Sequence, residues 1–157
     1  MNIELIVVGK TDMREVEALV TMYSQRLNHY VRFAITTIAD VRNTKKLSEA
    51  EQKRLEGEAI LKLISDSDHL TLLDEHGVEY RSIEFANILQ RRMLSGTKRL
   101  VFVIGGPYGF SDAVYQRANS KISLSKMTFS HQIVRAIFTE QLYRAFTIIK
   151  GEPYHHE

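Results

Sequence analysis

Strand-like runs alternate with helix-like segments along the whole chain. Five short runs are rich in branched apolar residues, the pattern of strands that are covered on both faces. Between them, apolar residues recur at spacings of three and four, which is typical of helices with one buried face. This alternation predicts an α/β fold, with a mostly parallel sheet and helices on both of its faces. The predicted strands are 1–8, 31–38, 69–73, 100–104 and 121–124, and the predicted helices are 12–29, 48–64, 82–96, 111–118 and 131–149.

Serines mark the expected starts of three helices. Ser48 stands three residues before Glu51, and each side chain of such a pair can accept a hydrogen bond from an unpaired backbone N–H. Ser82 and Ser111 precede two later helices and can cap them with the hydroxyl group. The helix after Ser48 is expected to bury the face that carries Leu55, Ala59 and Leu63.

The chain is expected to form a single domain over residues 1–157. Its 157 residues are close to the usual size of one domain, and one core can hold them. The composition of 44% hydrophobic and 25% charged residues is ordinary for a globular protein and argues against a disordered or fibrous one. We find no internal repeat and no linker-like segment, so no domain boundary is expected.

Several kinds of site are excluded or unsupported. The chain has no cysteine, which excludes disulfides, thiolate catalysis, iron–sulfur clusters and cysteine-bound zinc. No histidine pair at helical ligand spacing and no carboxylate cluster predicts a metal. No apolar run approaches the roughly 18 residues of a membrane span, and no secretory signal is visible. We therefore expect a cytoplasmic protein with no metal and no membrane partner.

The charges are distributed unevenly, although the net charge is only +2. Residues 47–87 contain ten acidic and four basic side chains, a balance of −6. Residues 88–150 contain ten basic and two acidic side chains, a balance of +8. Such asymmetry favours a polyanionic partner for the C-terminal half, unless the two halves simply neutralise each other in the fold.

The segment 131–149 is apolar over most of its circumference. Val134, Phe138, Leu142 and Phe146 line one face at steps of four, and several isoleucines widen the apolar surface. A helix of this kind is buried on more than one side. The second side either packs inside the same subunit or meets a second copy of the chain across a two-fold axis, and we expect the dimer.

Glycines cluster at 105–109 (GGPYG), between a predicted strand and a predicted helix. They let a ligand approach the backbone closely, and the start of the next helix favours negative charge. The spacing is not G-x-G-x-x-G and the loop follows the fourth strand, so a dinucleotide fold is poorly supported. The segment is either a ligand loop or a tight turn between strand and helix.

Two other loops leave predicted strands at the same expected edge of the sheet. Leu73 and Asp74 end the third strand, and residues 125–129 follow the fifth. The backbone of this last loop could bond the edge of an adenine, while Met127 and Phe129 cover an apolar ring. In open α/β sheets the ligand crevice lies outside the carboxyl ends of the strands, where all three loops meet.

The C-terminal tail carries two adjacent histidines. His155 and His156 cannot both bind one metal from a helix, because neighbouring residues there point in different directions. The pair is either a solvated tail or a base delivered to an active site.

Four segments, in this order and spacing, resemble the RlmH family of SPOUT methyltransferases. They are VVGK at 7–10, VFVIGGPYG at 101–109, LSKMTF at 124–129 with His131, Arg135 and EQLYRA at 140–145, and PYH at 153–155. The resemblance covers nearly the whole chain.

This resemblance implies a parallel α/β sheet with a C-terminal trefoil knot, assembled as a homodimer. The knot is expected from the resemblance alone, because chains as a rule do not thread loops. The resemblance also implies S-adenosylmethionine as the methyl donor and 23S rRNA as the substrate. The expected reaction is methylation of N3 of a pseudouridine in helix 69 of that RNA, on assembled ribosomes.

The family's cofactor residues correspond to eight positions of this chain, at the three strand ends chosen above on physical grounds. They are Leu73, Gly105, Leu124, Ser125, Lys126, Met127, Thr128 and Phe129.

The catalytic residues are expected near the C-terminus. We expect His155 to accept the N3 proton, because imidazole titrates near neutral pH. Tyr154 would stack on the base or bond to it, and Arg144 and Arg135 would hold phosphate or the carbonyl groups of the base. In a dimer, the tail would reach the cofactor of the partner subunit.

Two other classes of function stay open. A non-catalytic RNA-binding or ribosome-associated factor would keep the fold without binding S-adenosylmethionine. A nucleotide-dependent oxidoreductase would bind NAD, although the dinucleotide fingerprint is missing.

Overall fold

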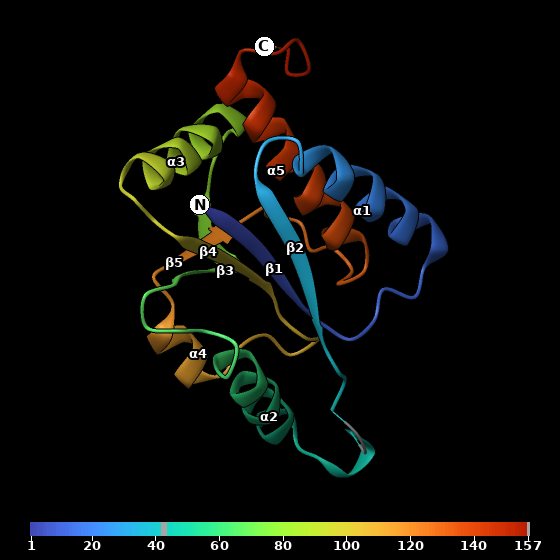
Figure 1. The fold of residues 1–157 in the computed structure, drawn as a ribbon. Helices are drawn as coiled ribbons and strands as arrows, with labels where there is room; N and C mark the ends of the chain where they lie inside the picture. The colour runs from blue at the N-terminus through green and yellow to red at the C-terminus, as the bar shows by residue number, and fades with distance from the viewer. Residues whose placement is uncertain (42–43, 157) are drawn as a thin grey trace.

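We describe residues 1–41 and 44–156 in a computed structural model of the chain. Strands and helices alternate, as the sequence predicts (Figure 1). The strands are β1 (Asn2–Val8), β2 (Arg32–Ile38), β3 (His69–Glu79), β4 (Arg99–Ile104) and β5 (Ser120–Ser123). The helices are α1 (Arg14–Leu27), α2 (Glu49–Leu61), α3 (Ser82–Leu94), α4 (Asp112–Arg117) and α5 (Ile133–Lys150), with a 3₁₀ turn, η1, at Thr44–Lys46.

The five strands form one sheet in the order β2-β1-β4-β3-β5. Every neighbouring pair is parallel, so the prediction of a parallel α/β sheet is confirmed. The carboxyl ends of the strands therefore lie at one edge of the sheet. The trefoil knot stays a prediction.

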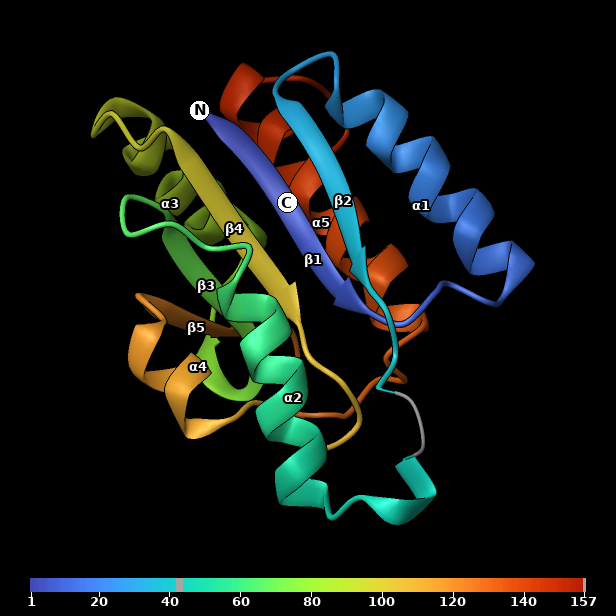
Figure 2. The same cartoon turned by 60° about the horizontal axis from the view of Figure 1, so that its bottom comes forward.

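Helices cover both faces of this sheet. On one face α5 lies between α1 and α3 and packs against both (Figure 1). Three phenylalanine rings meet in the core there: the Phe138 ring of α5 lies 4.8 Å from that of Phe102 in β4, and Phe85 of α3 contacts both. On the other face α2 and α4 lie side by side (Figure 2), where Ile60 and Val114 join the second core. Each such side chain contributes about 1.5–3 kcal/mol by leaving water.

Two of the three predicted serine caps are confirmed. The Ser48 and Ser111 hydroxyls accept hydrogen bonds from the N–H groups of Glu51 and Val114. Ser82 is instead the first residue of α3, and its hydroxyl donates to Gln141 of α5. The cap prediction for Ser82 is therefore wrong, because its hydroxyl hydrogen-bonds to a side chain of α5 and not to the first turn of α3.

The predicted buried face of α2 is also wrong. The buried residues of α2 are Gln52, Glu56, Gly57 and Ile60. Of the three residues predicted for this face, Leu63 lies beyond the helix and is 38% exposed, and Leu55 and Ala59 are only partly buried. Two polar residues, Gln52 and Glu56, lie on the buried face of α2. The spacing of the apolar residues therefore predicted a neighbouring face of the helix instead.

The third strand is longer than predicted. It continues past Leu73 through an irregular stretch and pairs with β5 again at Val78 and Glu79. Gly77 permits this, because a Cβ there would lie 2.5 Å from the Ile122 carbonyl carbon. The polar residues 74–77, expected as a loop after the strand, form a bulge inside it.

Arg135 is a structural residue, which corrects the expectation that it holds RNA. Its side chain is 1% exposed and links the start of α5 to the segment after β1. The guanidinium donates to the carbonyls of Val8, Gly9 and His131 and to the hydroxyl of Thr11, at 2.7–3.0 Å. Burial lowers the pKa of Arg135, although the charges of Asp12 and Asp40 oppose this.

No helix among residues 1–41 and 44–156 is long and apolar enough to cross a membrane.

We predict that Arg135→Met lowers the free energy of unfolding. The variant keeps most of the apolar stem but leaves buried carbonyls of Val8 and Gly9 without a donor, at about 1–3 kcal/mol for each group. Urea unfolding at fixed protein concentration measures the change. The exposed Arg14→Met serves as the matched control, and an equal stability of the two variants would contradict the structural role of Arg135.

Candidate functional site

A cavity of about 530 Å³ opens at the carboxyl ends of β3, β4 and β5. Its wall includes seven of the eight residues predicted to hold a cofactor. These seven are Leu73, Gly105, Leu124, Ser125, Met127, Thr128 and Phe129. Lys126 is exposed and is not part of the wall. The parallel sheet thus brings together residues that are far apart in the sequence.

The glycine loop, residues 105–109, forms one wall of the cavity, and its glycines expose the backbone there. Gly106 and Gly109 close a turn, in which the Gly109 N–H donates to the Gly106 carbonyl at 3.2 Å. A Cβ at Gly106 would come within 2.8 Å of the Glu56 carboxylate, which lies behind the loop. Glu56 thus leaves no room for a side chain at position 106. Because Gly106 has no side chain, a ligand in the cavity can approach its backbone closely.

A second wall is the loop between β5 and α5. The Ser125 hydroxyl accepts a hydrogen bond from the Met127 N–H at 2.9 Å, and the Ser125 carbonyl accepts one from the Ser123 hydroxyl. These bonds hold the loop while its apolar side chains stay open to solvent. Met127 is 78% exposed and Phe129 is 40% exposed. Two exposed apolar side chains beside a cavity are typical of a ligand-binding surface.

The bulge of β3 forms the third wall, around a buried acid. The Asp74 carboxylate accepts hydrogen bonds from the Tyr115 hydroxyl and from the His76 N–H. Burial acts to raise the pKa of Asp74, but these hydrogen bonds outweigh it and lower the pKa below its usual value. Burial and the bond to Asp74 raise the pKa of Tyr115. Asp74 is thus ionised, both of its carboxylate oxygens accept hydrogen bonds, and it forms part of the cavity wall.

Tyr115 has no signal in the sequence that predicts this contact. It lies on α4, and only the packing of α4 beside β3 brings its hydroxyl to Asp74.

The three predicted catalytic residues form a second cluster, at the C-terminal end of α5. Glu140 accepts hydrogen bonds from Arg144 Nη2 at 2.5 Å and from the Tyr154 hydroxyl at 2.9 Å. Arg144 Nη1 lies 3.4 Å from His155 Nδ1, and its guanidinium stacks over the Tyr154 ring at 4.8 Å. Within the described residues, Arg144 Nε has no hydrogen-bond partner.

Tyrosines surround this cluster and hold the tail against α1 and the turn before β2. Tyr143 packs against Tyr23, Tyr30 and Tyr154, with ring centroids 4.8–6.1 Å apart. The Tyr30 hydroxyl donates to Glu152, which raises the pKa of Tyr30 to about 12. Burial, and then the bonds to Tyr23 and Glu140, raise the pKa of Tyr154. The Tyr154 hydroxyl is therefore a donor at neutral pH and not a base.

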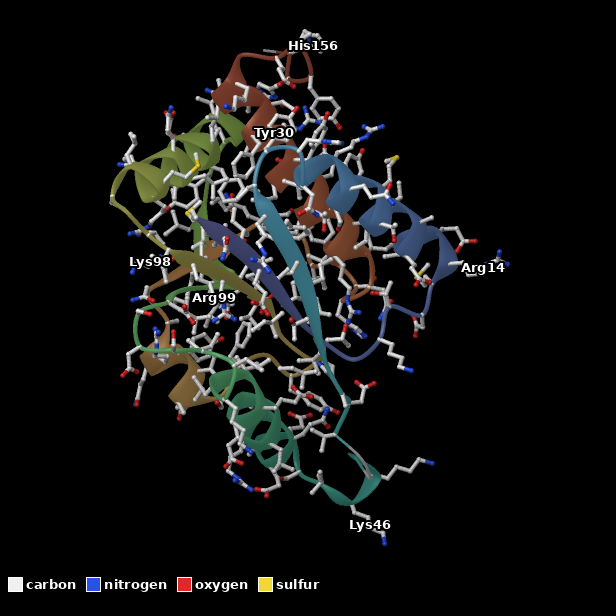
Figure 3. The ribbon with its side chains drawn as sticks, viewed as in Figure 1. Arg14, Tyr30, Lys46, Lys98, Arg99 and His156 are labelled. Atoms are coloured by element: carbon white, nitrogen blue, oxygen red, sulfur yellow. The ribbon has the colours of Figure 1, made fainter. Side chains whose placement is uncertain are left out.

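The cavity and the second cluster lie at different places along α5. His131, just before the helix, and Val134, in its first turn, line the cavity, whereas the tail folds back onto Glu140 and Arg144. These two residues lie about 9 and 15 Å beyond Val134 along the helix axis, at 1.5 Å for each residue, and none of Arg144, Tyr154 and His155 lines the cavity. Figure 3 shows Tyr30 and His156 together at one end of the molecule and Lys46 at the other. One subunit therefore does not bring the predicted catalytic residues to its own cavity.

A family model described as "Predicted SPOUT methyltransferase" matches residues 1–155. Curated relatives with the name "Ribosomal RNA large subunit methyltransferase H" match over nearly full length. The protein of Christiangramia forsetii is 60% identical over 156 residues, 99% of each chain. Those of Flavobacterium psychrophilum and Parabacteroides distasonis are 57% and 56% identical over 157 residues, the whole of each chain. With a cavity at the expected strand ends and matches of this extent, the chain belongs to the SPOUT methyltransferase family.

Proposed function

We propose that this protein methylates N3 of a pseudouridine in helix 69 of 23S rRNA, with S-adenosylmethionine as the donor and the assembled ribosome as the substrate. The observation that carries the proposal is the cavity at the ends of β3, β4 and β5, whose wall contains seven of the eight residues that the family resemblance assigns to the cofactor. The relatives' name supports large-subunit rRNA as the substrate. Because ribosomes are the proposed substrate, the protein would act in the cytoplasm.

The residues of the cavity fit this cofactor. S-adenosylmethionine supplies a methyl group on a positively charged sulfur. Backbone groups of residues 124–129 would bond the edge of its adenine, and Met127 and Phe129 would cover the ring. The bare backbone at Gly105 and Gly106 leaves room for the ribose or methionine part. Holding donor and acceptor in line can contribute about 7–11 kcal/mol to lowering the barrier.

The tail would handle the target base. Arg144 Nη1 lies beside His155 Nδ1, and a turn of the guanidinium toward the carbonyls of the base would let this nitrogen accept the N3 proton. The unpartnered Nε of Arg144 gives it a further donor for that purpose. Tyr154, which stays protonated, would hydrogen-bond the base or stack on it.

A homodimer would unite the two clusters in a composite site. Within one subunit none of Arg144, Tyr154 and His155 lines the cavity, whereas the tail of one subunit would meet the cavity of another. Packing of α5 between α1 and α3 uses much of its apolar surface inside the subunit. Ile133 nevertheless remains 43% exposed, beside the cavity-lining His131 and Val134.

Exposed basic side chains support RNA as the partner. Some of the basic residues in 88–150 are used inside the fold: Arg99 pairs with Glu4 and Asp68, and Arg144 pairs with Glu140. Others stay exposed and can contact phosphates, which would make ribosome binding weaken steeply with salt. They are Arg91, Lys98, Lys121, Lys126 and Lys150.

We predict that Phe129→Ala weakens the binding of S-adenosylmethionine at least fivefold. Stacking of an aromatic side chain on a base contributes about 1–3 kcal/mol. Calorimetric titration measures the affinity, with Leu19→Ala, an exposed residue of α1, as the control. No saturable binding of S-adenosylmethionine to the unmodified protein would favour the non-catalytic factor, and binding of NAD instead would favour the oxidoreductase.

We predict that His155→Ala slows ribosome methylation by about 10²–10⁴-fold, the usual contribution of a general base. Binding of S-adenosylmethionine, measured in parallel, separates loss of catalysis from loss of cofactor. His156→Ala is the matched control, because it removes the neighbouring, exposed imidazole. Unchanged methylation by His155→Ala would rule out the assigned role.

The same assay tests the choice of substrate. An isolated helix 69 hairpin offers few phosphates to the exposed basic side chains, so we expect it to be methylated far more slowly than intact ribosomes. Equal rates on both would contradict the ribosome as the required substrate.

A further inference from the structure

An acidic side chain of α2 lies directly behind the glycine loop. Glu56 is 4% exposed, and its carboxylate contacts Gly106: a Cβ built on this glycine would lie 2.8 Å from Oε1 and closer still to Oε2. Gly106 itself lines the cavity. A single glycine backbone therefore separates a buried carboxylate from the proposed cofactor site.

The charge of Glu56 is poorly neutralised. The carboxylate accepts one hydrogen bond, from Gln52 Nε2 at 3.1 Å, and no described residue forms a salt bridge with it. Burial raises the pKa of Glu56; the bond from Gln52 lowers it, and the charge of Asp40 raises it again. Charged side chains are almost never buried unless they are paired. The ionised Glu56 therefore costs folding stability.

The packing of α2 fixes this carboxylate relative to the loop. The next residue, Gly57, packs against Ser111, where an added Cβ would lie 3.2 Å from the Ser111 Cβ. Ser111 lies two residues after the glycine loop and caps α4. Because α2 contacts both Gly106 and Ser111, the backbone of α2 at Glu56 is held beside the loop.

The proposed reaction changes the charge of the molecule in the cavity. S-adenosylmethionine carries a sulfonium cation in addition to its ammonium and carboxylate groups, so its net charge is positive. The product, S-adenosylhomocysteine, has a neutral sulfur. A negative charge held in a poorly solvated place discriminates between two ligands that have nearly the same shape but differ by one charge.

We propose that Glu56 is a specificity-determining residue that makes the cavity prefer S-adenosylmethionine to S-adenosylhomocysteine. Its carboxylate stabilises the charged donor and not the neutral-sulfur product, which favours exchange of product for donor after each methylation. This inference rests on the proposed function, because it assumes that these molecules occupy the cavity.

Calorimetric titration at pH 8 tests the proposal with both ligands, because a higher pH favours the charged form of a carboxyl whose pKa is raised by burial. Glu56→Gln keeps the shape and removes the charge. We expect the ratio of the two affinities to fall about tenfold through weaker binding of S-adenosylmethionine, with little change for S-adenosylhomocysteine. Glu58→Gln, which removes an exposed charge from the same helix, should leave the ratio unchanged.

A folding measurement separates this role from a structural one. Because the variant removes a poorly neutralised buried charge, Glu56→Gln should be at least as stable as the unmodified protein to urea at pH 8. If it unfolds, Glu56→Leu provides a second uncharged variant with the same expected ratio.

An unchanged ratio in a folded variant would overturn the proposal, as would an equal loss of affinity for both ligands. If the unmodified protein binds neither ligand, the proposed function itself fails, and the two failures are therefore distinguishable.

Discussion

The packing of α5 across the centre of the sheet is the contact on which the rest of the structure depends. Phe138 joins it to Phe102 in the middle of the core, and α1 and α3 pack against its two sides. At its start, Arg135 ties it to the segment after β1; near its end, Tyr143 packs against tyrosines of α1 and of the turn before β2. The helix therefore fixes the position of the cavity, at its start, relative to that of the tail cluster, which packs on its later turns.

Much of the fold could be predicted from sequence because its signals are local. Apolar runs locate most of the strands, and the helices between them predict that the strands run parallel. The loop that forms the cavity wall was also predictable, since it leaves a strand end where parallel sheets bind ligands. Patterns failed where tertiary contacts override local preference: Gly77 lets β3 continue beside β5, and Gln141 takes the hydroxyl of Ser82.

The errors at polar residues share another cause. Arg135 looks like an RNA contact in the sequence, yet its guanidinium is buried among carbonyls that lie more than one hundred positions away in the chain. The sequence likewise contains no signal that Glu56 is buried behind Gly106. Composition reveals the charge of such residues but not their partners. Local rules are expected to fail in this way near functional sites, where a charge serves binding at the expense of stability.

The proposed function requires two chains for one site. The cavity and the tail cluster are each well formed, but the cavity wall contains none of Arg144, Tyr154 and His155 of the same subunit. The place for the methyl donor and the residues proposed to bind the target base are therefore in different clusters. Activity by a composite site is therefore the central claim.

Mixed dimers test that claim most directly. One parent carries Thr128→Trp, which fills the cavity from an exposed position, and the other carries His155→Ala. Each parent alone should be nearly inactive on ribosomes. We predict that mixing and reassociating the two restores activity, because half of the sites in a mixed dimer combine an intact cavity with an intact tail. Mixed dimers, verified by mass, that remain as inactive as their parents would contradict the composite site.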